Sequence, residues 1–195
     1  DTSRADLEIE VGLENRADRP VQGRIEGKIG EVSFSMPVEL SASERRTVRL
    51  TPAEFPQLRF NHPRLWWPNG YGDQPLYTLD LAFRQGDRIS DTERVVFGIR
   101  QYAYTVVNNN FRIWVNGFPI IVRGGNWGMA DALLHCDAKR YDTYVRLHRE
   151  MNLNMIRNWI GMEGDDEFYE ACDRCGIMIW DDFWRSEEHT SELQS

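Results

Sequence analysis

Three segments in the second half of the chain are apolar runs that end in polar and aromatic residues. They read IVRGGNW, NMIRNW and IMIWDDFW, at residues 121–127, 154–159 and 177–184. Amides, carboxylates and guanidinium groups hydrogen-bond to hydroxyl groups, and indole rings cover the apolar faces of a ligand. If the apolar runs are buried strands, their ends form a candidate site for a ligand that carries hydroxyl groups.

Arg157 has the strictest chemical requirement in these segments, because it follows the apolar residues of the second run. A guanidinium group keeps its charge in proteins, so a position inside an apolar run requires acceptor oxygens from a carboxylate or a ligand. Asp181 and Asp182 stand near the end of the third run and are the candidate partners. Two interpretations remain open, a structural ion pair beneath a site or a pair that shapes a ligand subsite.

Asn126 and Trp127 follow two glycines, where the backbone can approach a ligand closely. The amide of Asn126 supplies a donor and an acceptor together, and the indole of Trp127 suits the C–H face of a pyranose. In the alternative interpretation the glycines form a tight turn and Trp127 covers the core.

The segments between the three runs have the pattern of helices. Residues 138–151 place apolar side chains at helical spacing after Asp137, a residue type favoured at helix N-caps. A second helix is predicted over residues 165–175, with Gly176 ending it. Strand and helix therefore alternate, and parallel strands joined in this way present their C-terminal ends on one rim. We predict that residues 104–184 form the first three units of a (β/α)8 barrel, whose chemistry occurs at that rim.

The first half of the chain alternates apolar and polar residues in short stretches from Leu7 to about Tyr102. This pattern is typical of a β-sandwich, and residues 1–103 suit an immunoglobulin-like module of roughly 100 residues. Within it, the loop segment RLWWPNGYG contains Trp66 and Trp67. Two adjacent indoles could form a sugar-stacking platform, but bare rings would expose a large apolar area, and we therefore expect them to pack.

Asn116 and Gly117 lie between two apolar stretches, which is the strongest short-range signal for a β-hairpin. We expect a two-residue turn at this position. The second arm of the hairpin would lead into the first of the three apolar runs.

Composition argues against several classes of partner and site. The 195 residues include 23 basic and 31 acidic side chains, a net charge of −8 without long runs, which disfavours nucleic acid and anionic membranes as partners. Neither a membrane span nor a signal peptide is visible, and the chain opens on Asp1 rather than Met, which leaves room for a targeting segment ahead of it.

Cys172 and Cys175 have the spacing of a metal or redox pair. Without a second such pair we interpret them as structural and predict no metal site.

Residues 185–195 read RSEEHTSELQS and do not continue the alternation of strands and helices. This string resembles the translation of a common sequencing-library adapter, and we interpret it as an artefact to be left out of the fold. The alternative is a genuine, solvated acidic C-terminus, which would leave the edge of the third strand unpaired.

Five stretches of the chain together resemble family 2 of the glycoside hydrolases. They are RLWWPNGYGDQPLYTLDL, VFGIRQ, VNGFPIIVRGGNWG, REMNLNMIRNWIG and DEFYEACDRCGIMIWDDFW, and the likeness extends over Leu7–Trp184. The chain is most similar to the β-mannosidase-like branch, which includes endo-β-mannosidases whose barrels open with GGNW. The resemblance implies an immunoglobulin-like sandwich followed by a (β/α)8 barrel that is truncated after its third strand.

The same resemblance implies a retaining β-glycosidase that hydrolyses β-linked glycans or oligosaccharides, with β-mannosides as the first choice and no cofactor. Retaining enzymes use one glutamate as acid/base and another as nucleophile. The resemblance places both beyond Trp184, so the chain is expected to contain no catalytic residue and to be inactive alone. The substrate-binding residues that it implies are Asn126, Trp127, Arg157, Trp159 and Asp182.

Two alternatives remain open. Residues 160–163 read IGME where the β-mannosidase pattern usually has a glycine-rich stretch, which keeps β-galactosidase, β-glucuronidase and exo-β-glucosaminidase activities open. The second alternative is a non-catalytic carbohydrate-binding or adhesion protein, in which the sandwich with Trp66 and Trp67 is the working part.

Overall fold

The computed structural model describes residues 2–108, 110–128, 136–159 and 164–182, and it divides into two compact units. The first unit contains Asp1–Leu65 and Leu76–Ile99. The second contains Trp66–Pro75 and the chain from Arg100 onwards. The division after Ile99 lies close to the boundary predicted at residue 103, but Trp66–Pro75 belongs to the second unit although it lies within the predicted sandwich.

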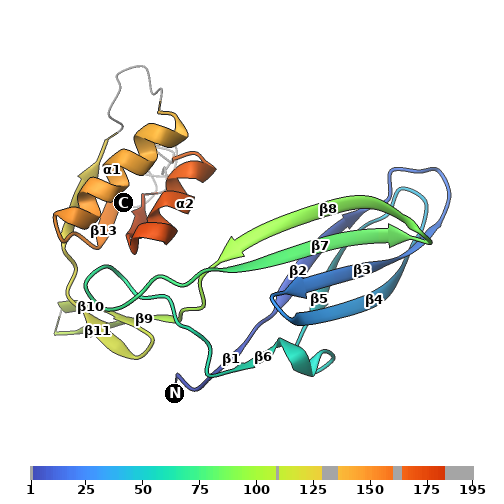
Figure 1. The fold of residues 1–195 in the computed structure, drawn as a ribbon, viewed down its shortest axis with the longest axis horizontal. Helices are drawn as coiled ribbons and strands as arrows, with labels where there is room; N and C mark the ends of the chain where they lie inside the picture. Colours follow the sequence, from blue (N-terminus) through green and yellow to red (C-terminus); the bar gives the residue numbers. More distant parts are fainter. Residues whose placement is uncertain (1, 109, 129–135, 160–163, 183–195) are drawn as a thin grey trace, which may run out of the picture. The chain divides into compact units, whose positions relative to one another are not determined.

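Two antiparallel β-sheets face each other in the first unit (Figure 1). The strands of one sheet are β2 (Ile9–Glu14) and β5 (Arg45–Leu50), and those of the other, in spatial order, are β4 (Val32–Leu40), β3 (Val21–Ile29), β7 (Tyr77–Gln85) and β8 (Arg88–Phe97). A short ladder joins β1 (Arg4–Asp6) to β6 (Arg59–Asn61), which follows a 3-10 turn at Pro56–Leu58. The predicted N-terminal β domain is confirmed, and its assignment to the immunoglobulin-like class stays a prediction.

Strand β4 shows how the sequence produces this unit. Its apolar residues Phe34 and Val38 are buried in the core, and the intervening Ser35 is exposed, as a strand with one solvated face requires. On the neighbouring strand, Gly27 stands opposite Phe34, and a Cβ added there would lie 2.1 Å from the Cζ atom of the ring. The space that Phe34 occupies therefore depends on the missing side chain of Gly27.

Segment Trp66–Pro75 is an integral part of the second unit. Trp66 is 1% exposed, and its indole N–H donates to the backbone carbonyl of Asp173 at 2.7 Å. Trp67 is half-buried and packs edge-on against Phe118, with 5.6 Å between ring centroids. The expectation that the two indoles pack, and do not form a flat exposed platform, is confirmed.

A small antiparallel sheet precedes the parallel strands of the second unit. Its strands are β9 (Tyr102–Val107), β10 (Asn110–Val115) and β11 (Phe118–Ile120), in the order β11-β10-β9. Between β10 and β11, Asn116 and Gly117 have φ angles of 51° and 80°. Positive φ at both positions is the backbone of a tight hairpin turn, and the predicted hairpin is confirmed.

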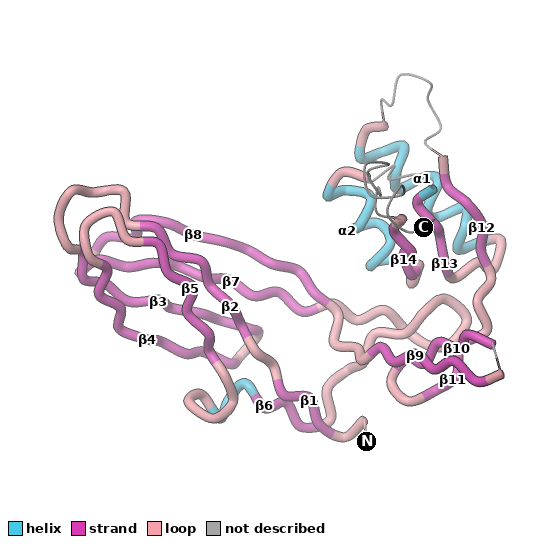
Figure 2. Tube along the Cα trace, turned by 180° about the vertical axis from the view of Figure 1, so that it is seen from behind, coloured by secondary structure: helices cyan, strands magenta, loops and turns pink. Residues whose placement is uncertain are grey.

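Strand and helix alternate in the rest of the second unit, as predicted (Figure 2). The elements are β12 (Gly124–Trp127), α1 (Ala138–Glu150), β13 (Met155–Asn158), α2 (Asp166–Cys175) and β14 (Met178–Asp181), and the three strands form a parallel sheet in the order β12-β13-β14. The carboxylate of Asp137 accepts a hydrogen bond from the Arg140 amide at 2.8 Å and caps α1. Gly176, with φ of 74°, ends α2 in the left-handed conformation.

The two helices pack on one face of this sheet. Tyr141, Val145, Ile156 and Phe168 are completely buried between the helices and the strands. The continuation of this parallel unit into a barrel stays a prediction, and residues 185–195 lie outside the described part of the chain. None of the helices that the structure describes is long and apolar enough to cross a membrane.

Candidate functional site

The register of the three parallel strands divides their C-terminal residues between two faces. Asn126, Arg157 and Trp180 are neighbours across the sheet, and so are the next residues along each strand, Trp127, Asn158 and Asp181. Because side chains alternate between faces, the two sets lie on opposite sides. We call Trp127, Asn158 and Asp181 the helix-face row, since Trp127 packs against the helices. Together with Asp182, which bonds to Arg157, the other set forms the open-face group: Asn126, Arg157, Trp180 and Asp182.

An ion pair with two hydrogen bonds joins two strand ends in the open-face group. The Nε and Nη2 atoms of Arg157 donate to Oδ1 and Oδ2 of Asp182 at 3.1 and 2.7 Å. The side chain of Arg157 is 46% exposed and that of Asp182 is 24% exposed. Arg157 is thus not buried within its apolar run, because the alternation of the strand turns it away from the helices. The two-point contact fixes the plane of the carboxylate.

Asn126 completes this arrangement from the third strand. Its side-chain oxygen accepts a hydrogen bond from Nη1 of Arg157 at 3.4 Å. This contact orients the amide so that its NH2 group can donate to a ligand oxygen. The structure thus brings together Asn126, Arg157 and Asp182, three of the five substrate-binding residues implied by the family resemblance.

Two tryptophans are exposed near these polar groups. Trp159, the fourth implied residue, directly follows β13 and is 46% exposed. Trp180 is not among the residues that the sequence indicates as substrate-binding, although it is 44% exposed and is the register neighbour of Arg157. Its position two residues before Asp182 is the signal that could have identified it, because residues i and i+2 of a strand share a face.

Trp127, the fifth implied residue, lies on the other side of the sheet. It is 7% exposed and stacks on Phe168, with an angle of 19° between the rings and 5.9 Å between their centroids. Tyr144 and His148 of α1 contact the same ring edge-on. The structure therefore matches the alternative interpretation in which Trp127 covers the core. Successive side chains of β12 point to opposite faces, so Asn126 lies on the open face and Trp127 lies against the helices.

The two consecutive aspartates have different partners. Asp182 belongs to the pair with Arg157, whereas Asp181 accepts a hydrogen bond from Nδ2 of Asn158 at 2.5 Å on the helix side. Only one of the two candidate carboxylates thus joins the open-face group. Residues 160–163, which carry the departure from the β-mannosidase pattern, lie outside the described residues.

The Cys-x-x-Cys pair lies in the helical core. Cys172 is 1% and Cys175 is 8% exposed, and burial raises the pKa of both thiols above the ordinary value. A neutral, buried thiol is neither a good nucleophile nor a metal ligand, which fits the structural interpretation. Within the described ranges, no three His, Cys, Asp or Glu side chains are grouped so that they could hold a metal ion.

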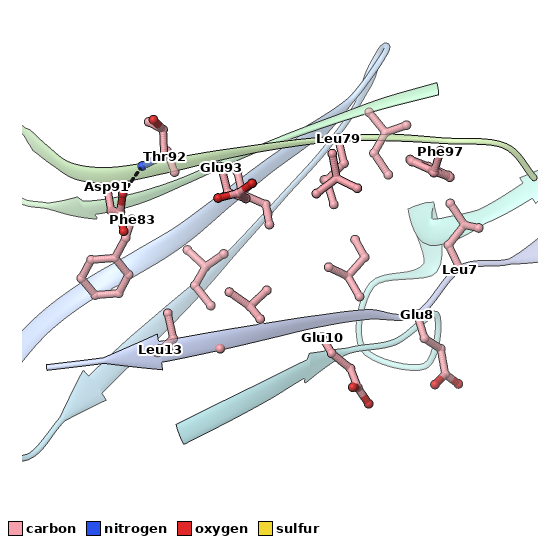
Figure 3. A pocket seen from close by; sticks show the side chains of 18 residues that line it. Leu7, Glu8, Glu10, Leu13, Leu79, Phe83, Asp91, Thr92, Glu93 and Phe97 are labelled. Carbon is pink, nitrogen blue, oxygen red and sulfur yellow. Dashed lines mark hydrogen bonds between the residues drawn. The ribbon is translucent and has the colours of Figure 1, made fainter. Parts of the chain in front are cut away.

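A cavity in the first unit bears on the alternative function of the sandwich. Its volume is about 460 Å³, and it lies between β2 and strands β7 and β8, where Leu7, Leu13, Leu79 and Phe97 line it (Figure 3). Most of the lining is aliphatic, and Glu8, Glu10, Asp91 and Glu93 also line the cavity. Because the aliphatic side chains belong to the core between the two sheets, the cavity is an opening in that core.

Comparison with known proteins gives the sequence relatives. Residues 1–100 match the model of the family "Glycosyl hydrolases family 2". An exo-beta-D-glucosaminidase of Streptomyces avermitilis is 36% identical over 178 residues, which are 89% of this chain and 19% of the relative. A mannosylglycoprotein endo-beta-mannosidase of Lilium longiflorum is 35% identical over 93% of this chain and 20% of its own length. The chain thus spans about a fifth of the length of these relatives.

A solved protein structure is also similar to this chain. The exo-chitosanase of Amycolatopsis orientalis superposes with a TM-score of 0.82 and 28% identity, over 92% of this chain and 20% of the other. Since this match covers nearly the whole chain, the likeness extends over both compact units.

Proposed function

Because the chain belongs to family 2 of the glycosyl hydrolases, we propose that it is part of a longer enzyme that hydrolyses β-linked glycosides, with β-mannosides as the preferred substrates. The observation that carries this proposal is the Asn126–Arg157–Asp182 arrangement on the open face. Its three groups come from three strand ends, so it forms only when the parallel unit is folded.

These groups are suited to hold the hydroxyls of one sugar ring. The carboxylate of Asp182 keeps lone pairs beyond those used by Arg157, and can accept from sugar hydroxyls. Asn126 can donate its NH2 hydrogens to a hydroxyl oxygen. Trp159 and Trp180 offer exposed indole surface for the C–H face of the ring. Holding the sugar in one orientation lowers the entropic cost of reaching the transition state.

The charges of the open-face group favour a neutral sugar. Both oxygens of Asp182 accept from Arg157, and Asp181 lies on the other face. The two charges of the Arg157–Asp182 pair therefore balance each other. A subsite without net charge supports a neutral sugar such as a mannoside.

The chemical step requires two further groups. In a retaining glycosidase, two carboxyl groups about 5 Å apart act as nucleophile and as acid/base, and a covalent glycosyl-enzyme forms between the two steps. By the family resemblance, we assign both glutamates to the part of the enzyme that follows Trp184. Residues 1–184 expressed alone are therefore expected to hydrolyse no glycoside.

A substrate panel tests the proposal. The complete protein encoded by the extended reading frame is assayed with the p-nitrophenyl β-glycosides of mannose, glucosamine, galactose and glucuronic acid. The largest kcat/KM is expected with the mannoside. A preference for the glucosaminide would support the proposed β-glycoside hydrolysis but refute the assignment of mannose as the preferred sugar. No hydrolysis of any of the four would refute the proposal and favour a carbohydrate-binding protein.

A further inference from the structure

A second set of polar side chains lies directly behind the open-face group. Strands β12 and β13 each end in two consecutive residues, one for each face: Asn126 with Trp127, and Arg157 with Asn158. On the third strand, Asp181 is the last residue of β14 and Asp182 directly follows it. The helix-face row therefore shares its backbone with the residues that we propose contact the sugar. A shift of one of its side chains moves a neighbour on the open face.

Two buried polar atoms of the helix-face row have no hydrogen-bond partner among the described residues. Asn158 is completely buried and Trp127 is 7% exposed. Oδ1 of Asn158 and Nε1 of Trp127 have no hydrogen-bond partner within the part of the chain that the structure describes, whereas Nδ2 of Asn158 donates to Asp181. Unpaired buried donors and acceptors are unfavourable and rare in native proteins.

These two atoms are complementary. Nε1 of Trp127 is a donor and Oδ1 of Asn158 is an acceptor, and the two residues are register neighbours on one face of adjacent strands. The ring of Trp127 is held by its stack on Phe168 and by two further aromatic contacts, so it cannot rotate freely to find another acceptor. A molecule that accepts from one atom and donates to the other would satisfy both.

We propose that one buried water molecule binds in the helix-face row, accepting from Nε1 of Trp127 and donating to Oδ1 of Asn158. Buried waters typically make two to four hydrogen bonds to such otherwise unpaired groups. The chain Trp127–water–Asn158–Asp181 then links the ends of all three strands. Trp127 and Asn158 are positioning residues, since they act on the sugar only through Asn126, Arg157 and Asp182. This last consequence rests on the proposed function, whereas the water site does not.

Two substitutions remove the two unpaired atoms. Trp127→Phe keeps a stacking ring of smaller size and removes the N–H, and Asn158→Leu keeps a similar side-chain size and removes the amide together with its bond to Asp181. Each single change lowers the thermal unfolding midpoint of the complete protein, because Asn158→Leu also removes the bond to Asp181 and Trp127→Phe leaves a smaller ring in the core. If one water bridges the two atoms, the double variant loses less stability than the sum of the two single losses, since the second change finds the bridge already broken. Additive losses would refute the bridge.

Two further measurements make the test independent of activity. A high-resolution crystal structure of the complete protein is expected to show the water on both atoms, and a protein group bonded to either atom would overturn the site. Kinetics test the positioning role: with the best glycoside of the panel, Asn158→Leu is expected to raise KM by about threefold or more. The control Ile156→Val, at a completely buried apolar residue on the same face of β13, should leave KM unchanged. An equal rise in KM for both variants would refute positioning while leaving the water site to the crystal structure.

Discussion

Asn69 offers the sharpest test of how the segment Trp66–Pro75 stabilises the second unit. Its Nδ2 donates to the backbone carbonyls of Arg149 and Leu153, both at 2.9 Å, at the C-terminal end of α1. Its backbone N–H donates to the carbonyl of Gly176 at 2.8 Å, at the end of α2. One residue of the segment therefore caps two helices that lie far from it in the sequence.

Asn69→Ala removes both side-chain hydrogen bonds and keeps the backbone one. A net contribution of about 0.5–1.5 kcal/mol per bond, with the solvent-exposed bond to Arg149 near the lower limit, gives a loss of about 1–2 kcal/mol in the free energy of unfolding. Asn69→Asp should cost more near neutral pH, because a carboxylate would lie beside two carbonyl oxygens at the negative end of α1.

The pH dependence of the second variant provides an internal check. The two carbonyls raise the pKa of the introduced carboxyl in the folded state above its unfolded value near 4. Protonation restores a donor, so Asn69→Asp recovers stability as the pH falls through that raised pKa and loses it again as the pH rises. Asn69→Ala should show no such dependence.

Thermal unfolding of the complete protein measures these effects. The matched control is Asn110→Ala, which removes one long exposed contact, 3.4 Å from Nδ2 to the carbonyl of Asn108, and should change the unfolding midpoint little. If Asn69→Ala behaves like this control, the capping role of Asn69 is wrong and the segment is held by its tryptophans alone.

Three further predictions follow from single contacts. Arg157→Lys keeps the charge but loses the two-point contact with Asp182, so kcat/KM of the complete enzyme toward its best glycoside should decrease about tenfold or more in steady-state assays. Gly27→Ala places a Cβ 2.1 Å from the ring of Phe34 and should destabilise the first unit by about 1–3 kcal/mol in thermal unfolding. Burial raises the pKa of the Cys172 thiol, so at pH 8 it should react with a thiol reagent only after unfolding. Because the pKa of this thiol is higher in the folded than in the unfolded state, its contribution to stability is complete below about pH 8.5 and decreases as the pH rises above that value. The unfolding midpoint, measured against pH for the native chain and for Cys172→Ala, tests this dependence.

Each of these three changes has a control in the same chain. Arg146→Lys alters an exposed ion pair with Glu150 on α1 and should leave kcat/KM unchanged. Gly12→Ala adds a Cβ with no other atom within 4 Å and should not destabilise by contact. Cys136 is only partly buried and should be labelled faster than Cys172 in the native state. A control that responds like its test variant would remove the structural reason given for that prediction.

Elements with strong local signals could be predicted from the sequence. Asp137 and Gly176 mark the start of α1 and the end of α2 through side-chain and backbone preferences of single residues. The turn at Asn116 and Gly117 depends only on which residues tolerate positive φ. These signals need no knowledge of the rest of the fold. The segment Trp66–Pro75 shows the opposite case, because its partners lie about 80 residues further along the chain.

The candidate site could be predicted only in part, because the strands of a parallel sheet are buried on both faces. A strand that is covered on both faces is apolar at odd and even positions alike, so its sequence does not show which parity faces the helices. The sequence therefore offers both Asn126 and Trp127 as candidate contacts, and only the former lies on the open face. The same ambiguity left Asp181 and Asp182 as equal candidates for Arg157 until the hydrogen bonds distinguished them.

Consecutive polar residues at the end of such a strand cannot both contact the same ligand, because their side chains point to opposite faces of the sheet. One is placed to contact a ligand, and the other is enclosed by helices and must find a partner there. In this chain, Arg157 and Asn158 show both outcomes: the former pairs with Asp182 in the open, and the latter bonds to Asp181 in the interior. An alanine scan that follows each strand end residue by residue should therefore alternate between open-face variants that raise KM with little loss of stability and helix-face variants that lose stability and raise KM by a smaller factor, through their neighbours on the open face. A scan in which neighbours behave alike would mean that the two faces are not energetically distinct.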